Sequence, residues 1–263
     1  MGLFDKKFCA VCGEKIGIIA TRKLEDGGHL CKDCAKKLSP WFSDRRNSTA
    51  AEIKAQLEYR EANKEAVAAF RPTRTLGRFT KLILDEDARK FVVTDASNLL
   101  EANPDVLDFS QVTGCDLDVR ENRRELKRTG QDGKQISYIP PRYEYSYDFY
   151  VTIHVNTPYF DEMNYKLNAA SVSTGEQAMN AAPGGWRVQR TGILSGVRTN
   201  DYYEYLNLGN EIKDTLTQMR QEIRRDAEEA KAPRQAVTCP WCGATTTGDA
   251  SGCCEYCGGS LNG

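Results

Sequence analysis

Eight of the ten cysteines form pairs separated by two residues, a spacing typical of tetrahedral metal sites. Two such pairs lie near each end of the chain, with eighteen residues between the pairs of the first set and eleven between those of the second. Thiols at this spacing bind Zn²⁺ more readily than they form a stable disulfide. We predict two zinc ions, one held by Cys9, Cys12, Cys31 and Cys34 and the other by Cys239, Cys242, Cys254 and Cys257.

Two residues beside these pairs are alternative ligands. His29 lies two residues before Cys31, and Cys253 directly precedes Cys254. We assign Cys254 because it keeps the two-residue gap to Cys257, and we place His29 in a turn or at the surface. Whether either residue substitutes as a ligand stays open from the sequence.

A zinc site filled by four thiolates is closed, whereas catalytic zinc keeps one position for water. We therefore predict that both sites are structural. The chain has only two histidines, His29 and His154, and the latter has no obvious partner, which excludes most metal-hydrolase and histidine-activated nucleophile schemes. Cys115 lies in a strand-like run and is predicted to be a buried thiol. With no P-loop or Gly-x-Gly-x-x-Gly sequence either, we predict that the protein is not an enzyme.

The composition is that of a soluble protein, with 40% hydrophobic and 28% charged residues among 263. No apolar run approaches the roughly 18 to 20 residues that span a membrane, and Met1 to Phe8 lacks the apolar stretch of a secretory signal. We expect a cytoplasmic protein. Two zinc ions on eight thiolates would take the formal charge from -1 to about -5, which disfavours nucleic acid.

The residues around the first cysteines predict a small module at residues 6–46. Phe8 to Gly13 reads as a zinc knuckle, and the apolar run from Ile16 to Arg22 precedes turn residues at Asp26 to Gly28, which predicts a short hairpin. Cys34 is followed by a helical pattern that ends before Pro40. Knuckle, hairpin and helix in this order are typical of a treble-clef zinc finger.

A connecting helix is predicted within residues 47–72, because Thr49 and Glu52 form a capping-box pair and Pro72 ends the pattern. Charge interrupts the middle of its apolar face. The helix therefore either packs partly on the protein or docks against a partner. The predicted face consists of Ala50, Ile53, Leu57, Lys64, Val67 and Phe70.

Residues 73–200 read as strands. Phe79 to Asp85 and Arg89 to Thr94 are predicted to form a hairpin, and a second pair of extended runs lies within Val106 to Val119. Arg120 to Lys134 is rich in charge, which indicates a solvated hairpin tip or, as the alternative, a phosphate-contacting patch. Tyr143 to Val155 alternates apolar and polar residues, so we predict one long strand with its apolar face in a core.

The C-terminal third combines an excursion, a helix and a second zinc module. Small polar residues at 169–182, followed by Pro183 to Gly185, indicate a flexible excursion with a turn. A helix at 203–230 carries a continuous apolar stripe and is expected to cover the open edge or mouth of the sheet, with a charged linker ending near Pro233. Residues 236–263 form two knuckles, the pattern of a zinc ribbon. The stripe consists of Leu208, Ile212, Leu216, Met219 and Ile223.

Three stretches carry a resemblance to an uncharacterised bacterial family: F-C-A-V-C-G at 8–13, G-G-H-L-C-K-D-C-A-K-K-L-S-P at 27–40 and L-I-L-D-E-D-A-R-K-F at 82–91. Members of that family have an N-terminal four-cysteine domain of unknown function followed by a pleckstrin-homology-like domain. The resemblance spans about residues 8–225, and the ribbon is an accessory. It implies an α+β fold in which residues 73–230 form an antiparallel, partly open barrel or sandwich closed by the helix at 203–230. It implies no activity.

Two structural zinc modules around a β-rich domain favour a cytoplasmic adaptor or scaffold that binds other proteins. The sequence identifies neither the partner nor the oligomeric state. A peripheral membrane protein that binds lipid through the pleckstrin-like domain is one alternative. A nucleic-acid-binding zinc-finger protein is another, with phosphate contacts from Lys6, Lys7, Lys15, Arg22, Lys23, Lys32, Lys36 and Lys37.

Overall fold

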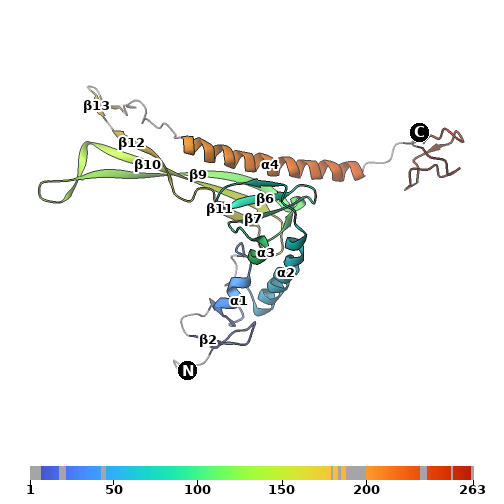
Figure 1. Ribbon diagram of the computed structural model, residues 1–263, viewed down its shortest axis with the longest axis horizontal. Coiled ribbons are helices and arrows are strands. Elements are labelled where there is room, and N and C mark those ends of the chain that lie inside the picture. The colour runs from blue at the N-terminus through green and yellow to red at the C-terminus, as the bar shows by residue number, and fades with distance from the viewer. Residues whose placement is uncertain are drawn as a thin grey trace. The chain divides into compact units, whose positions relative to one another are not determined.

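The computed structural model describes residues 7–17, 22–42, 46–178, 180–182, 185–187, 200–231, 236–249 and 251–261. Helices and antiparallel sheets are mixed, in agreement with the predicted α+β class (Figure 1). The chain divides into two compact units, Met1–Arg220 and Gln221–Gly263, which are described separately. Among the described helices, none has the length and apolar character needed to cross a bilayer.

The first cysteine module has knuckle, hairpin and helix in the predicted order. Strand β1 (Lys7–Phe8) pairs with β2 (Lys15–Ile16) around the knuckle, and β3 (Arg22–Lys23) pairs with β4 (His29–Leu30). Helix α1 (Lys32–Lys37) follows at once. The knuckle and the hairpin are joined where the backbone N–H of Ala10 donates to the carbonyl of His29 over 2.8 Å, so the two cysteine pairs are held beside each other.

Helix α2 (Ala50–Ala69) begins at the predicted capping box, in which Thr49 and Glu52 each bond the other's backbone N–H. Asp26 of the β3–β4 turn also accepts from the N–H of Ala50 at 2.8 Å, and this bond lowers the pKa of Asp26. The cysteine module and the start of α2 thus share one core. That core contains Cys9, Ile16, Leu24, Leu30, Cys31, Cys34, Ala35, Leu38, Phe42 and Ile53.

The first sheet is antiparallel, with strand order β5 (Arg74–Leu76), β6 (Lys81–Asp85), β7 (Lys90–Thr94) and β8 (Leu107–Asp108). The hairpin predicted from the flanking apolar runs is β6–β7. Consecutive residues of β6 and β7 are buried, and consecutive residues of a strand point to opposite faces. Both faces of this hairpin are therefore covered. On one side Phe70, Ile83 and Val92 form a cluster at the end of α2.

The second sheet is built around the long strand β10 (Gln135–Val155), which pairs along one edge with β9 (Val112–Thr129). Along its other edge lie β12 (Val172–Ala178) and then β11 (Glu162–Lys166). No hydrogen-bonded strand pair joins the two sheets among the described strands, so the barrel is not closed.

The apolar face of β10 is buried over only half of the predicted length. Phe149, Val151, Ile153 and Val155 are buried, whereas the tyrosines from Tyr143 to Tyr147 are only partly covered. Before Arg142, β10 pairs with β9 alone among the described strands, in an arm that extends beyond the rest of the sheet (Figure 1). Residues 130–134 of the predicted solvated hairpin tip form the end of this arm, whereas Arg120 to Thr129 belong to β9, which corrects the prediction there.

The excursion predicted at 169–182 is largely strand, which corrects that prediction where the residues are described. Residues of β12 pair with β10 between Arg142 and Tyr147. A further short hairpin joins β13 (Asn180–Ala182) to β14 (Gly185–Arg187). The turn residues Pro183 and Gly184 lie outside the described residues.

Helix α4 (Asn200–Lys231) packs on the face of the second sheet, whereas we expected it at the open edge or mouth. The ring of Phe149 lies 5.1 Å from that of Tyr202 and 5.8 Å from that of Tyr205. Two residues of the predicted stripe, Ile212 and Leu216, are fully buried, and Leu208, Met219 and Ile223 are partly covered.

The second unit includes the last residues of α4 and the strand pair β15 (Val237–Thr238) and β16 (Thr245–Thr246). The predicted linker end at Pro233 is outside the described residues.

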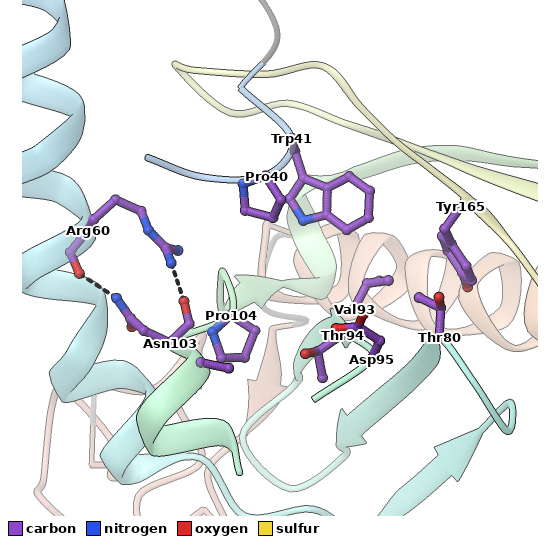
Figure 2. Close-up of a pocket in the computed structure, with 11 residues that line it drawn as sticks. Pro40, Trp41, Arg60, Thr80, Val93, Thr94, Asp95, Asn103, Pro104 and Tyr165 are labelled. Carbon is purple, nitrogen blue, oxygen red and sulfur yellow. Dashed lines mark hydrogen bonds between the residues drawn. The ribbon is translucent and has the colours of Figure 1, made fainter. Parts of the chain in front are cut away.

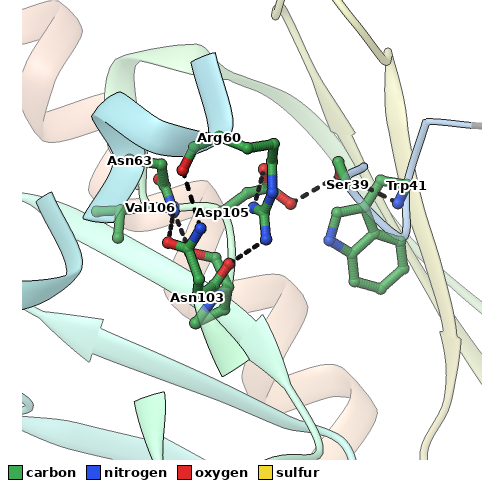
Figure 3. A network of polar contacts seen from close by, with 8 residues as sticks. Ser39, Trp41, Arg60, Asn63, Asn103, Asp105 and Val106 are labelled. Atoms are coloured by element: carbon green, nitrogen blue, oxygen red, sulfur yellow. Dashed lines mark hydrogen bonds and ion pairs between the residues drawn. The ribbon is translucent and has the colours of Figure 1, made fainter. Parts of the chain in front are cut away.

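A buried ion pair joins the cysteine module, α2 and the first sheet (Figure 3). Asp105 has no exposed surface and precedes β8; its carboxylate accepts from Arg60 Nη1 of α2 and from the hydroxyl of Ser39 after α1, both over 2.8 Å. Burial raises the pKa of Asp105, although the charge of Arg60 acts in the opposite direction. Arg60 and Ser39 thus offset only part of the cost of desolvating this carboxylate.

The loop between α3 (Leu99–Ala102) and β8 completes this network. Asn63 of α2 donates to the Asn103 side chain and to the Pro104 carbonyl, both over 2.7 Å, and accepts from the N–H of Val106 at 3.0 Å. Arg60 Nη2 donates to the Asn103 carbonyl. Polar groups of α2 therefore satisfy the backbone of a buried loop, which apolar side chains could not do.

This network explains the interrupted stripe of α2 and corrects the predicted face. The buried residues of the helix are Ile53, Gln56, Arg60, Asn63 and Val67, which follow one helical face without a gap. Lys64, which we had placed on that face, is exposed and pairs with Glu61. The helix thus packs on its own protein along its full length, and the polar middle is its most constrained part.

Replacing Asp105 by Ala is expected to destabilise the first unit by about 3 to 5 kcal/mol, because Arg60 would keep a buried charge without its partner. The double variant Arg60→Met/Asp105→Leu should recover most of this loss, since no buried charge remains. Urea unfolding followed by circular dichroism measures both. Glu61→Ala, next to Arg60 on α2, removes the exposed ion pair with Lys64 and should change stability by no more than about 0.5 kcal/mol. An equal loss for all three variants would contradict this account.

Gly209 allows α4 to lie against the second sheet. A Cβ at this position would lie 2.5 Å from Leu117 Cδ1 of β9. Although Ala is favoured over Gly in a helix by about 1 kcal/mol, Gly209→Ala should therefore lower the stability. Combining it with Leu117→Ala should cost less than the sum of the two single losses, because the second substitution removes the obstructing atoms. Additive losses in the same unfolding assay would show that the close approach is unimportant.

Candidate metal centres

The first cluster consists of Cys9 and Cys12 from the knuckle, Cys31 just before α1 and Cys34 within α1. Their sulfur atoms all lie within 4.8 Å of one another. The sulfurs of Cys12 and Cys31 are 3.8 Å apart. A tetrahedron of four sulfurs about 2.3 Å from a zinc ion has edges of about 3.8 Å. The spacing of the sulfurs therefore fits one ion such as Zn²⁺.

The local backbone fixes these sulfurs. Gly13 has φ +75°, a conformation that glycine adopts without strain, and the knuckle turns there. The N–H of Cys31 donates to the sulfur of Cys9 over 3.4 Å, and the N–H of Cys34 donates to the sulfur of Cys31 over 3.3 Å. Cys31 is at the same time the N-cap of α1, so the start of that helix and the sulfur position are set together.

Thiols in this cluster compete for protons. Burial acts to raise the pKa of Cys9, but donation from the backbone N–H groups of Cys12, Cys31 and Val11 lowers it to about 6. The pKa of Cys34 is raised, first by burial and then by the neighbouring sulfurs. A divalent cation would remove this conflict, because it stabilises all four thiolates at once.

The second cluster has the same geometry. Cys239 and Cys257 have sulfurs 3.6 Å apart, as do Cys242 and Cys254, and all four sulfurs lie within 4.8 Å of one another. The pKa of Cys239 is lowered to about 7: burial acts to raise it, and the backbone N–H groups of Cys242 and Trp241 outweigh that effect. This set too fits one ion such as Zn²⁺.

Neither alternative ligand belongs to a cluster. His29 has Nδ1 at 2.8 Å from the Gly28 carbonyl oxygen, and it is absent from the first set of converging ligands. Cys253 pairs with Ser260 in an isolated β-bridge, and only Cys254 contributes to the second set. Within the described residues, each cluster therefore consists of four thiols.

Cys115 and His154, for which the sequence predicts no catalytic role, each have identifiable neighbours in the structure. Cys115 is buried as predicted, and burial, followed by the charge of Asp116, raises the pKa of its thiol to about 12. His154 was expected to have no partner, which is wrong, because its Nε2 lies 3.0 Å from a carboxylate oxygen of Asp116. Asp116 lies in β9 and His154 in β10, so this contact could be predicted only if the pairing of the two strands were known.

Sequence reasoning also missed two aromatic residues of the second module. Trp241 and Tyr256 are 75% and 72% exposed, and each directly precedes the second cysteine of its pair. Their matching positions in the two knuckles were a signal available in the sequence. The indole N–H of Trp241 donates to the Ser260 carbonyl over 3.1 Å, which holds the exposed ring in one orientation.

The described residues thus define a mixed α and β chain with antiparallel sheets and two four-cysteine clusters. Residues 7–56 match the family described as "Domain of unknown function (DUF4428)". The match ends within α2 just past Ile53, the residue of that helix that shares the core of the cysteine module. No curated protein and no solved structure matches the chain.

Elemental analysis of the purified chain is expected to find two zinc ions. Cys9→Ser and Cys239→Ser should each remove one ion, because each cluster needs its full set of thiolates. Cys115→Ser and Cys253→Ser are matched controls that should retain both ions. Acidification should release the metal, since the thiolates must become protonated. Retention of both ions in Cys9→Ser, or an ion with a bound water, would contradict closed four-thiolate sites.

Proposed function

We propose that this protein is a non-enzymatic, zinc-binding cytoplasmic adaptor in which both ions are structural and the modules bind other proteins. The observation that supports this most directly is the second module, where a cluster of four thiols carries an exposed Trp241 and Tyr256. A metal ion there would have no position open for water, and thus no Lewis-acid chemistry to offer.

The aromatic pair has the properties of a protein-binding surface. Trp and Tyr are enriched among residues that contribute most to binding, because they bury a large area while losing little conformational freedom. The indole ring of Trp241 is already held in place by its hydrogen bond to Ser260. It also packs closely on Gly259, where an added Cβ would lie 2.5 Å from Trp241 Cδ1. Binding through this ring would therefore cost little ordering entropy.

Zinc in this proposal supplies the stability that the second module lacks. A segment of this size buries too little apolar surface to fold alone, whereas zinc binding contributes about 10 to 16 kcal/mol in comparable peptides. In the module, Cys239 and Cys254 are themselves among the few fully covered residues. Its shape, and hence the position of Trp241, would depend on the metal.

The two sheets with α4 form the remaining domain, for which we propose a pleckstrin-homology-like architecture. Its support is the succession of two antiparallel four-stranded sheets followed by a helix that packs on the second of them. Such domains bind peptides or lipid headgroups, and fold alone does not select between them. For this chain we favour the protein-binding role, in line with the aromatic surface of the second module.

Trp241→Ala/Tyr256→Ala is expected to lose the proteins that copurify with the native chain while keeping two zinc ions. The reason is that the substitutions remove exposed area and no ligand. Tyr203→Ala, 48% exposed on α4, is the matched control and should retain them. Quantitative mass spectrometry of affinity-purified material at low and high salt measures the effect. An unchanged set of partners would contradict the adaptor surface, and nucleic acid lost steeply with salt would favour the nucleic-acid alternative.

A further inference from the structure

A pocket of about 270 Å³ lies in the first unit, where the segment after α1 meets α2, the first sheet and the α3–β8 loop. Trp41 forms one wall, and Val93 and Pro104 contribute apolar surface beside it (Figure 2). Arg60 lies on one side of the pocket in this view, and Tyr165 of β11 lies on the other. This volume is close to the lower end of the roughly 300 to 1,000 Å³ typical of small-molecule sites.

Three hydrogen-bond donors of this pocket have no partner among the described residues. They are the indole Nε1 of Trp41, the Nε of Arg60 and the hydroxyl of Tyr165, and all three atoms are buried. Arg60 and Tyr165 are only 7% and 6% exposed. Leaving such a group unsatisfied costs about 1 to 3 kcal/mol, so donors that gather around one pocket indicate a place for acceptors.

The chemistry of these donors restricts what would satisfy them. The N–H groups of Trp41 and Arg60 can only donate, and burial raises the pKa of Tyr165, which keeps its hydroxyl protonated. The Nη atoms of Arg60 are already engaged by Asp105 and Asn103. A complementary ligand therefore presents oxygen or nitrogen acceptors and a flat apolar surface for the indole ring.

A second hollow, of about 320 Å³, shares Pro40, Arg60 and Ala102 with the pocket. Its other lining residues include Arg22 and Lys36, and none of the described carboxylates lines it. Two cations here, next to the guanidinium of Arg60, favour an anionic group. Asp95 lines the first pocket, so an anionic group would avoid that pocket and lie toward the second hollow.

We propose that the two hollows form one binding site for a small planar aromatic molecule that carries a phosphate or carboxylate group. The ring lies against Trp41 and accepts hydrogen bonds from the buried donors, and the anionic group reaches Arg22 and Lys36 across the rim formed by Ala102. No cysteine lines either hollow, although the second hollow lies on the first cysteine module.

The test uses the full zinc-loaded chain and paired probes that differ in the anionic group: adenosine 5′-monophosphate with adenosine, and indole-3-acetate with indole-3-acetamide. Binding is measured by titration calorimetry and by saturation-transfer NMR. At least one anionic probe should bind at least tenfold more tightly than its uncharged partner. Arg22→Ala/Lys36→Ala should abolish that difference, whereas Lys37→Ala, on the same short helix but outside the lining, should preserve it. The identity of the preferred probe distinguishes a phosphate from a carboxylate.

A second pair of variants tests the ring end without disturbing the core. Ala102→Phe places a bulky group on the exposed rim shared by both hollows and should weaken binding at least tenfold. Glu101→Phe, one residue earlier in α3 and outside the lining, should leave it unchanged. Trp41→Leu should reduce affinity for every probe that binds. If no anionic probe binds, or if binding survives in Ala102→Phe and in Arg22→Ala/Lys36→Ala, the proposal is wrong.

Discussion

A carboxylate with no exposed surface needs partners, and Asp105 obtains them from two other parts of the first unit. Arg60 comes from α2, and Ser39 from the end of the cysteine module. Apolar contacts alone would let these parts slide past one another, because such contacts have no direction. Hydrogen bonds to one fixed carboxylate set the position of both parts relative to the first sheet. We interpret the network as the device that specifies this packing, at some cost in stability.

The same arginine also shapes the neighbouring pocket. Its Nη atoms bond Asp105 and Asn103, and its Nε has no partner among the described residues. The charge of the guanidinium is thus fixed in place between the two hollows at no further ordering cost. Structural and binding roles are therefore combined in one side chain, and the sequence pattern of α2 showed neither.

The two cysteine clusters differ in how much of the fold depends on them. In the first module, Cys9, Cys31 and Cys34 belong to a core that includes Leu30, Phe42 and Ile53. In the second, two of the four cysteines are exposed and the described core is little more than the sulfurs. A metal ion would accordingly complete a core in the first case and replace one in the second. The first module has enough apolar surface to share a core with the start of α2, whereas the second exposes its aromatic residues.

Features that depend on residues close together in the sequence were predicted correctly. Cysteine spacing gave both clusters, the Thr49–Glu52 capping box gave the start of α2, and alternating apolar residues gave the β6–β7 hairpin. Features that depend on a distant neighbour were missed. Val172 to Ala178 has the small polar residues of a loop and becomes a strand because β10 offers it an unpaired edge. The tyrosines from Tyr143 to Tyr147 share the period of the buried residues after them, yet they lie where α4 only begins to cover the sheet, since Tyr202 near the start of that helix contacts Tyr147.

The β9–β10 arm shows why charge content alone is a weak guide to a partner. Its arginines read in the sequence as a possible phosphate patch, but the pairing of the strands gives several of them other contacts. Arg120 lies 4.2 Å from the centre of the Tyr150 ring and 2.8 Å from Asp118, and Arg124 lies 2.6 Å from Glu144. Phosphate would have to compete with these contacts. Arg22 and Lys36, by contrast, line a hollow that no carboxylate lines in the part of the chain that the structure describes. We therefore place the anion site there, although it has fewer cations than the arm.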